Sequence, residues 1–442
     1  MPGVAGLKRQ LGWFDAAALY VGIILGSGIF VAPAAVAQAA PALGSAAGMW
    51  LLGAFIAGCG AFCYAECGAR LPRTGGFYVF YRETYGDTVA FVGGWAALLI
   101  TYPASVAAIA LIFARYLAQI IPQAEWEAGV AAAAVVASGL LNVVGVRVGA
   151  WAQRLLTATK VIALAVLCLA ALLAPVSAAP LAAATPAGLT MDLGVLTAAL
   201  VVMLWTYDGW SDVTLVAGEI DNPGRNLGRA VLVGTLTLAA LYLLVQMAVL
   251  VLLPADAAAG SKQVVADAVR AGLGTAAGRM VAVLVVVSTF GSLHGVIFTA
   301  SRLGFAMANE GAFLPWLAAV HPRFGTPARS TAALVAATLV FVFVATFQNL
   351  LGLFSFNVWI FYGTSAVALL VLRRRGVGEP VTWRAPGGAL APLVVVATAL
   401  CMTVGLLVQS PLRSVMGLGL LAAGLPVYAV WTLARRRLKA PR

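Results

Sequence analysis

Long apolar stretches recur along the whole chain, and they limit the environment in which it folds. A stretch of about 20 apolar residues is long enough to cross the core of a bilayer as a helix. Hydrophobic residues make up 62% of the 442 residues and charged residues only 10%, whereas a soluble domain has about 25% charged residues. The sequence therefore predicts an all-α membrane protein with twelve transmembrane helices. These lie near residues 15–39, 42–69, 89–121, 128–146, 153–174, 193–217, 228–253, 279–308, 330–346, 349–372, 390–409 and 413–434.

Basic residues are concentrated in alternate connections between these stretches. Of the 27 Lys and Arg residues, 21 lie in one set of segments, which includes both chain ends, and five lie in the opposite set. Short loops rich in Lys and Arg stay in the cytoplasm, so we expect both termini to be cytoplasmic and the protein to lie in the cell (inner) membrane. Because the charges follow this topology, the formal net charge of +12 indicates contact with lipid and no nucleic-acid partner.

Two of the predicted helices are interrupted by glycine and small polar residues. The first contains Gly22, Gly26, Ser27 and Gly28, and the sixth contains TYDGWSD at 206–212. Five spans separate the starts of these two helices, and an odd number of spans per repeat inverts the second unit relative to the first. Paired glycine-interrupted helices in two inverted halves point to the binding site of a secondary transporter. We therefore expect a 5+5 inverted repeat with discontinuous helices 1 and 6; the alternative for the first segment is a plain helix-packing face.

The predicted helices divide the chain into five parts. We expect a cytoplasmic N-terminus at 1–14, a first repeat of helices 1–5 at 15–175, a second repeat of helices 6–10 at 176–375, helices 11 and 12 at 376–434, and a cytoplasmic C-terminus at 435–442. We expect no cofactor and no metal site, because Cys59, Cys63 and Cys67 share one apolar helix face as packing residues do.

The two interruptions expose backbone groups that suit an α-amino acid. Backbone at membrane depth must be buried in protein or line a watery cavity. The Gly-Ser-Gly run at 26–28 supplies N–H groups with little steric cover and precedes a half-helix, whose positive end attracts an anion such as a carboxylate. Free carbonyl groups at the broken end of the sixth helix suit an ammonium group. A carboxylate site next to an ammonium site matches the backbone of an α-amino acid.

Several segments of the chain are familiar. They are GSGIF at 26–30, AECGARLPRTGGFYVFYRETYG at 65–86, WTYDGWSDVTLVAGEIDNPGRNLGRA at 205–230, STFGSLHGVIFTASRLGFAMANEGAFLPWLAAVHPRFGTP at 288–327 and FNVWIFYGTSAVALLVLRRR at 356–375. In this order they resemble the amino acid–polyamine–organocation superfamily, most closely its L-type amino acid transporter branch with the bacterial exchangers and permeases. The resemblance runs from about residue 12 to residue 434. It implies a leucine-transporter-like fold and amino acid transport by alternating access.

The resemblance also implies which residues bind the substrate. These are Ile24, Gly26, Ser27, Gly28, Trp205 and Asp208. The amides of Ser27 and Gly28 would hold the carboxylate, while the carbonyls of Ile24 and Trp205 and the backbone at Asp208 would hold the ammonium. Trp205 also stands where the family places an aromatic gate. We expect the substrate side chain to meet residues such as Tyr102, Ser105, Trp205 and Phe356.

Lys160 is a basic residue within a predicted span. Related transporters of this fold bind sodium between helices 1 and 8, and Ser288 and Thr289 stand at the resembling positions of helix 8. The resemblance implies that the Lys160 ammonium takes the place of sodium. The alternative is a lysine that snorkels to the inner interface. Val249 stands where the L-type branch often has a tyrosine, and Tyr242, seven residues earlier, is not an obvious substitute.

Three other ionisable residues have less definite interpretations. We expect Asp208 to face the gap in the sixth helix and Asp212 to accept hydrogen bonds from nearby backbone. His294 either relays protons or is a buried neutral ring. Glu66 forms an ion pair at a gate or is simply solvated.

Other classes of protein fit this sequence less well. An enzyme would gather His, Asp or Cys at one interface, but the two histidines lie 27 residues apart in different segments. A channel would carry polar rings along several helices, and the sequence shows none. A sensor is the remaining alternative, and flux into liposomes would separate it from a carrier. The sequence predicts a sodium-independent exchanger or permease of neutral L-amino acids, without catalytic residues and with no partner subunit assigned. The alternative is a proton-coupled symporter of cationic amino acids or polyamines.

Overall fold

The computed structural model describes residues 7–121, 126–173, 192–344, 347–381 and 383–439. The first half of the chain forms α1 (Trp13–Ile24), η1 (Gly28–Phe30), α2 (Ala32–Ala39), α3 (Leu43–Arg70), α4 (Phe77–Tyr85), α5 (Asp87–Ala96), the π-helical turn η2 (Ala97–Thr101), α6 (Tyr102–Ile120), α7 (Glu127–Val143) and α8 (Val146–Leu173). The second half forms α10 (Leu193–Thr206), η3 (Asp212–Glu219), α11 (Pro223–Leu252), α12 (Ala255–Gly260), α13 (Val264–Leu273), α14 (Thr275–Asn309), η4 (Pro315–Ala318), α15 (Ala328–Val344), α16 (Phe347–Arg375), α17 (Leu390–Gln409), α18 (Pro411–Ala422) and α19 (Gly424–Lys439).

Among the described residues, eight helical segments are long and apolar enough to cross a bilayer. They are Leu43–Arg70, Asp87–Ile120, Val146–Leu173, Pro223–Leu252, Thr275–Asn309, Phe354–Arg375, Leu390–Val408 and Ser414–Leu433. Four shorter apolar helices accompany them, namely Trp13–Ile24, Glu127–Val143, Leu193–Thr206 and Ala328–Val344. The all-helical, membrane-type architecture is therefore confirmed, while the twelve spans and the inverted repeat stay predictions.

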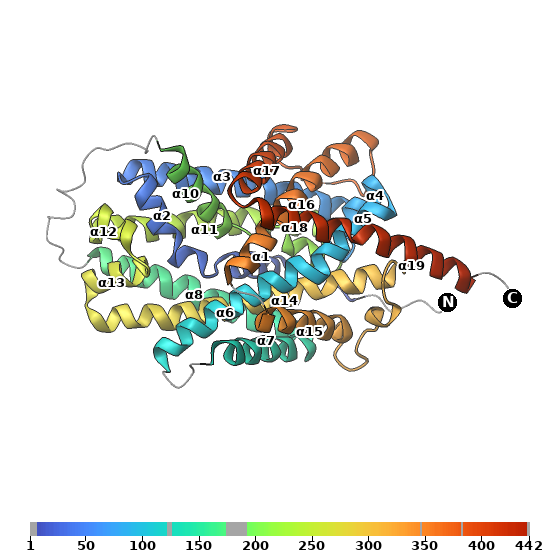
Figure 1. Ribbon diagram of the computed structural model, residues 1–442, viewed down its shortest axis with the longest axis horizontal. Helices are drawn as coiled ribbons and strands as arrows, with labels where there is room; N and C mark the ends of the chain where they lie inside the picture. The colour runs from blue at the N-terminus through green and yellow to red at the C-terminus, as the bar shows by residue number, and fades with distance from the viewer. Residues whose placement is uncertain (1–6, 122–125, 174–191, 345–346, 382, 440–442) are drawn as a thin grey trace.

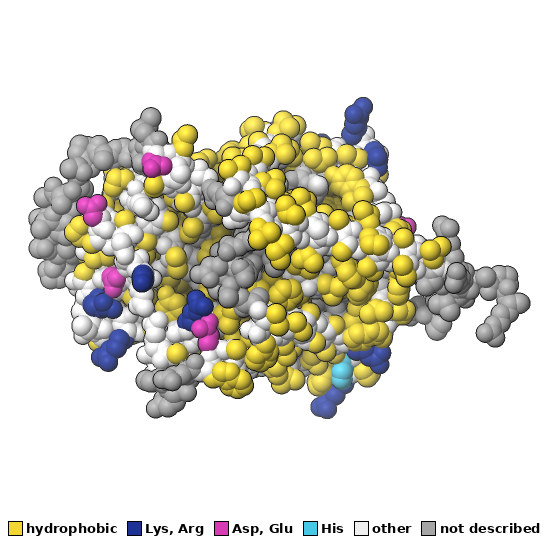
Figure 2. Space-filling model, viewed as in Figure 1, with side chains coloured by type: hydrophobic (Ala, Val, Ile, Leu, Met, Phe, Trp, Pro, Cys, Tyr) yellow, Lys and Arg dark blue, Asp and Glu magenta, His cyan; other side chains and the backbone are white. Residues whose placement is uncertain are grey.

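The long helices pack alongside one another and run along the long axis of the molecule (Figure 1). The short helices α12 and α13 lie at one end, and α4 and the far end of α19 lie at the other. Hydrophobic side chains cover most of the middle of the face in Figure 2, and charged side chains lie toward its two ends. Leu236, Leu400 and Val430 are more than 60% exposed. An apolar surface of this extent suits contact with lipid.

Two helices stop inside the bundle and give way to short irregular segments. α1 ends at Ile24 and η1 begins at Gly28, while α10 ends at Thr206 and η3 begins at Asp212. Gly209 makes the second turn, because its φ of +106° is a conformation that residues with a Cβ rarely adopt. A Cβ on Gly209 would also lie 2.7 Å from Cγ2 of Ile23. Both interruptions lie where the sequence predicts them, and they touch each other.

A short backbone pairing ties the segment before α1 to the end of η3. The amides of Gln10 and Leu11 donate to the Glu219 carbonyl at 2.9 and 3.0 Å, and the Asp221 amide donates to the Leu11 carbonyl at 2.9 Å. The Leu11 side chain is buried. The N-terminal segment and η3 are therefore held together at one end of the molecule.

An aromatic cluster fixes the connection between α10 and η3 against α3 and α16. The Trp210 ring stacks on Tyr362 with ring centroids 3.8 Å apart and meets the Tyr64 ring edge-on at 5.2 Å. Gly60 of α3 lies directly against Trp210, so that a Cβ on Gly60 would come within 2.4 Å of the indole. The glycine allows the connection before η3 to approach α3 at this point.

We expect Gly60→Val to destabilise the protein. The new side chain meets the Trp210 ring, which its aromatic neighbours hold in place, and overpacking of this kind costs about 1–3 kcal/mol. Thermal unfolding in detergent, followed by fluorescence-detected size exclusion, should show a lower melting temperature. Gly48→Val on the same helix is the control, because a Cβ there meets nothing within 4 Å. Equal melting temperatures for the two variants would contradict the packing described here.

Candidate functional site

A buried cavity lies where the two interruptions meet. It encloses about 80 Å³ between the ends of α1 and α10, η1, η3, α6, α14 and α16. Tyr102 and Ser105 line it, as the sequence predicts, whereas Phe356 lies elsewhere and packs against Gly417 of α18. The six residues assigned to the substrate also line the cavity, namely Ile24, Gly26, Ser27, Gly28, Trp205 and Asp208.

The first interruption presents free N–H groups. The amides of Ser27 and Gly28 donate no hydrogen bond to any acceptor in the described part of the chain. Gly28 lies close to the other broken helix, because a Cβ there would lie 3.0 Å from Cα of Thr206. Unpaired N–H groups at the start of a helical turn are suited to an anion. This part of the cavity therefore fits a carboxylate.

The second interruption presents carbonyl groups. The Trp205 carbonyl accepts the Asp208 amide at 3.0 Å, and the Ile24 carbonyl accepts the Gly26 amide at 2.7 Å. The carbonyl of Asp208 accepts no hydrogen bond from the residues that the structure describes. Each carbonyl oxygen has two lone pairs, so acceptor capacity for an ammonium group exists at all three positions.

Tyr242 of α11 joins the two broken helices. Its hydroxyl lies 3.0 Å from the Thr206 carbonyl and 3.3 Å from the Ile24 carbonyl. The sequence analysis found Tyr242 no obvious substitute for the tyrosine of the L-type branch, and it did not predict this position between the two broken helices. The one available signal is that a buried tyrosine hydroxyl needs an acceptor, and interrupted helices supply free carbonyls.

Two carboxylates line the cavity. Oδ1 of Asp208 accepts a hydrogen bond from the Tyr362 hydroxyl at 2.6 Å. Oδ1 of Asp212 accepts hydrogen bonds from the Tyr102 hydroxyl at 3.0 Å and from the Ser211 hydroxyl at 3.1 Å. The sequence analysis expected Asp212 to accept hydrogen bonds from nearby backbone. In the structure, side-chain hydroxyls hold it instead.

Lys160 lies beside the broken end of α1. Its Nζ donates to the carbonyls of Gly22 at 2.5 Å, Leu25 at 2.6 Å and Ser288 at 3.2 Å, and to the Ser292 hydroxyl at 3.2 Å. The side chain is 1% exposed, which contradicts the alternative of a lysine that snorkels to the interface. A ring of carbonyl and hydroxyl oxygens around a positive charge is the environment of a bound metal cation.

One of the two residues assigned to this cation site lies outside it. The Ser288 hydroxyl donates to the Leu25 carbonyl at 2.8 Å, as expected. The Thr289 hydroxyl instead turns back to its own helix and donates to the Val285 carbonyl at 2.7 Å. Ser292 takes its place, with its hydroxyl 2.9 Å from the Gly22 carbonyl. Residues four apart share a helix face, so the spacing from Ser288 was the signal for Ser292.

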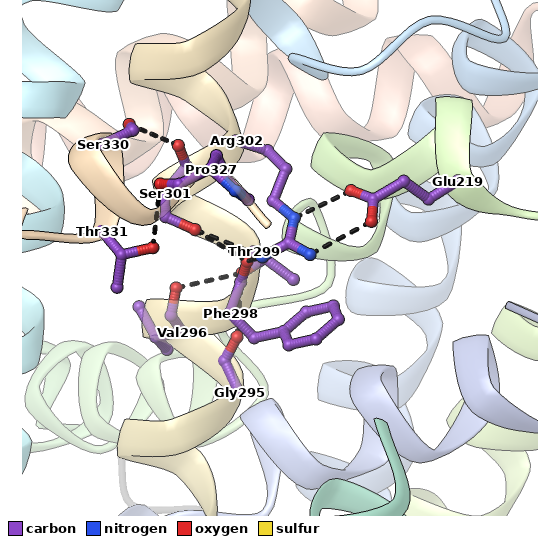
Figure 3. Close-up of polar contacts among 10 residues, drawn as sticks. All are labelled: Glu219, Gly295, Val296, Phe298, Thr299, Ser301, Arg302, Pro327, Ser330 and Thr331. Carbon is purple, nitrogen blue, oxygen red and sulfur yellow. Dashed lines mark hydrogen bonds and ion pairs between the residues drawn. The ribbon is translucent and has the colours of Figure 1, made fainter. Parts of the chain in front are cut away.

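A buried ion pair joins the end of η3 to α14 (Figure 3). Arg302 reaches across to Glu219 and donates to its two carboxylate oxygens at 2.8 and 3.1 Å. Neither side chain is exposed, and the guanidinium lies 4.0 Å above the Phe298 ring. Arg302 also donates to the Phe298 carbonyl at 2.5 Å. The sequence-based analysis did not single out this pair, because its members are 83 residues apart.

The structure decides between the two interpretations of His294 and of Glu66. His294 Nε2 lies 3.0 Å from the Gly149 carbonyl, and Nδ1 lies 3.1 Å from the Asn142 amide nitrogen. One acceptor and one donor around the ring favour a buried neutral histidine.

Glu66 is fully buried and accepts hydrogen bonds from Arg70 at 2.9 Å and from Arg373 at 2.5 Å, so it forms an ion pair and is not solvated.

Comparison with known proteins gives one consistent result. The family model described as amino acid permease matches residues 11–426. The serine/threonine exchanger SteT of Bacillus subtilis is 30% identical over 430 residues, which cover 96% of this chain and 97% of that protein. The b(0,+)-type amino acid transporter 1 of Homo sapiens is 30% identical over 389 residues, covering 86% and 80%. The large neutral amino acids transporter small subunit 2 of Homo sapiens is 29% identical over 437 residues, covering 96% and 81%.

We expect Arg302→Met to destabilise the protein strongly. The substitution leaves the Glu219 carboxylate buried without its partner, which costs about 3–5 kcal/mol. The double variant Glu219→Leu/Arg302→Met removes both charges and should recover most of the loss. Melting temperatures in detergent test this, and a double variant that is less stable than Arg302→Met alone would show that the two charges are not coupled.

Proposed function

Because the chain belongs to the amino acid permease family, we propose that it is a sodium-independent exchanger of small neutral L-amino acids that works by alternating access. The family also confirms the prediction of a membrane transporter and not an enzyme. The observation that carries the proposal is the cavity itself. It brings the free amides of Ser27 and Gly28 and the Asp208 carbonyl into one buried space.

The substrate would lie across the two interruptions. Its carboxylate faces the amides of Ser27 and Gly28, and its ammonium faces the carbonyls of Ile24, Trp205 and Asp208. Gly26 lines the same cavity and lets the first interruption pack closely against α14, since a Cβ there would lie 3.2 Å from the Ser292 hydroxyl. Trp205 lines the same space and acts as the aromatic gate over the substrate.

Lys160 would replace the sodium ion. Its ammonium group contacts both α1 and α14, through Leu25 and Ser288, with Ser292 as a further ligand and Thr289 behind it on the helix. A fixed positive charge at this point leaves no vacancy for a metal cation. Transport is then independent of sodium, and the lysine itself holds the two helices in contact.

The twelve-span topology belongs to the same proposal. The four shorter apolar helices supply the spans beyond the eight long ones, α1 together with η1–α2 makes helix 1, and α10 together with η3 makes helix 6. Residues 15–175 and 176–375 are the two inverted repeats, and 376–434 hold helices 11 and 12. The described ends of the chain lie at the same end of the molecule in Figure 1, which fits an even number of spans, and the basic residues favour cytoplasmic segments at 1–14 and 435–442 in the inner membrane.

The relatives do not favour the alternative function. One of them is named as a serine/threonine exchanger and another as a transporter of large neutral amino acids, so a proton-coupled symporter of cationic amino acids or polyamines is the weaker interpretation. The name of the large neutral amino acids transporter includes the words small subunit. No partner subunit for this chain follows from that name.

We expect transport to be the same in sodium and in choline buffers. Counterflow of radiolabelled L-serine into proteoliposomes tests this directly. Lys160→Gln should lose most of its flux in both buffers, because α1 and α14 lose the charge that joins them. Lys262→Gln, an exposed position, is the matched control and should retain full flux. Wild-type flux that rises steeply with sodium, or normal flux in Lys160→Gln, would rule out this role.

We expect Gly28→Leu to abolish amino acid binding while the protein stays folded. The leucine Cβ meets Thr206 of α10 at 2.8 Å from its Oγ1, so the side chain pushes the two interruptions apart and displaces the amides that face the carboxylate. Affinity for L-serine should fall at least tenfold, which corresponds to about 1.4 kcal/mol. Scintillation proximity binding measures the affinity, and size exclusion checks the fold. Gly44→Leu is the control, because a Cβ there meets nothing within 4 Å. Wild-type affinity in a folded Gly28→Leu protein would remove the proposed carboxylate site.

A further inference from the structure

Asp212 places a carboxylate in the wall of the cavity with only one oxygen engaged. The hydroxyls of Tyr102 and Ser211 both donate to its Oδ1. They hold the side chain, which is 5% exposed, between α6 and the start of η3. The other oxygen, Oδ2, accepts no hydrogen bond from any residue that the structure describes, and Asp212 lines the cavity.

This free oxygen is open to the cavity. The described residues that line the cavity include no Lys, Arg or His that could pair with it. Lys160 is engaged by the carbonyls of α1 and α14. A donor group on a molecule in the cavity can therefore bind Oδ2, and such a bond to a charged group is worth about 1.5–3 kcal/mol.

Under the proposed function, the backbone of the substrate is already satisfied. Its carboxylate faces the first interruption, and its ammonium faces the carbonyls of the second. Asp212 takes part in neither contact and is held by Tyr102 of α6. Its Oδ2 is therefore open to a donor on the substrate side chain.

Ser105 adds a second polar group to this wall. It follows Tyr102 by three residues on α6 and so lies on the same helix face. Its hydroxyl makes no hydrogen bond within the described residues, and Ser105 lines the cavity. A hydroxyl group both donates and accepts. A substrate hydroxyl can therefore donate to Asp212 Oδ2 while it accepts from Ser105 Oγ.

We propose that Asp212 and Ser105 form a subsite for a hydroxyl group on the substrate side chain, so that the transporter selects serine and threonine over alanine and 2-aminobutyrate. The inference rests on the proposed function, since it takes the rest of the cavity to hold an amino acid backbone. The amine of a short diamino acid offers the same hydrogen-bond donor, and the experiment separates the two sources.

The experiment is competition binding on the purified full-length protein, with radiolabelled L-serine as the probe. Serine and alanine differ by one hydroxyl, and so do threonine and 2-aminobutyrate. We expect each hydroxylated ligand to bind about tenfold more tightly than its partner, the effect of one hydrogen bond to a charged group. In Asp212→Asn, the Tyr102 and Ser211 hydroxyls hold the amide oxygen, and an N–H donor replaces Oδ2. The serine-to-alanine preference should then fall about tenfold.

A second variant covers the case in which Asp212→Asn does not fold. Ser105→Ala only shortens a side chain at the cavity and should also reduce the serine-to-alanine preference. Ser45→Ala is its control, because that hydroxyl donates to the Ala42 carbonyl away from the cavity. An unchanged preference in Ser105→Ala, or in a folded Asp212→Asn, overturns the subsite.

The remaining outcomes separate this inference from the proposed function. Equal affinity of the wild-type protein for serine and alanine overturns the subsite and leaves amino acid transport standing. Binding of L-2,3-diaminopropionate that is more than tenfold tighter than that of serine overturns the hydroxyl assignment, because Asp212 then binds a cation. Failure of any of these amino acids to bind contradicts the proposed function itself.

Discussion

The interrupted end of α1 depends on the ammonium group of Lys160. When a helix stops inside a bundle, its last carbonyls lose their intrahelical donors, and a bilayer has no water to replace them. One ammonium group satisfies the carbonyls of both Gly22 and Leu25. The C-terminal end of a helix also carries a partial negative charge that stabilises a cation. Because Lys160 satisfies these carbonyls, α1 can end within the membrane, and the amides that follow it stay free.

The same requirement explains the other polar side chains around the two interruptions. The Tyr242 hydroxyl donates to a backbone carbonyl at the junction between α1 and α10. The hydroxyls of Ser288 and Ser292 donate to carbonyls at the end of α1, beside Lys160. Each contributes one hydroxyl group. At the two interruptions, the amides of Ser27 and Gly28 and the carbonyl of Asp208 keep no partner among the described residues, and these residues line the cavity.

The positions of the helices and of their interruptions could be predicted because they depend on local composition. Runs of apolar residues mark the spans, and Gly28 and Gly209 mark the turns. The partners of buried side chains could not be predicted in this way. Thr289 and Ser292 lie on one helix, but only the rotation of α14 against its neighbours decides which hydroxyl meets α1. Asp212 likewise finds its partner in Tyr102, which is 110 residues away in the chain.

Glu219 connects segments that are synthesised at very different times. Its carbonyl binds the amides of Gln10 and Leu11, and its carboxylate binds Arg302. At about 5–20 residues per second, the N-terminal segment leaves the ribosome roughly 10–40 s before η3 exists. During this interval the first helices insert, and the backbone groups of Leu11 lack the hydrogen-bond partners that Glu219 and Asp221 provide later. This end of the molecule is therefore completed late in biogenesis, and a chain truncated before η3 leaves its own N-terminal segment without a place to bind.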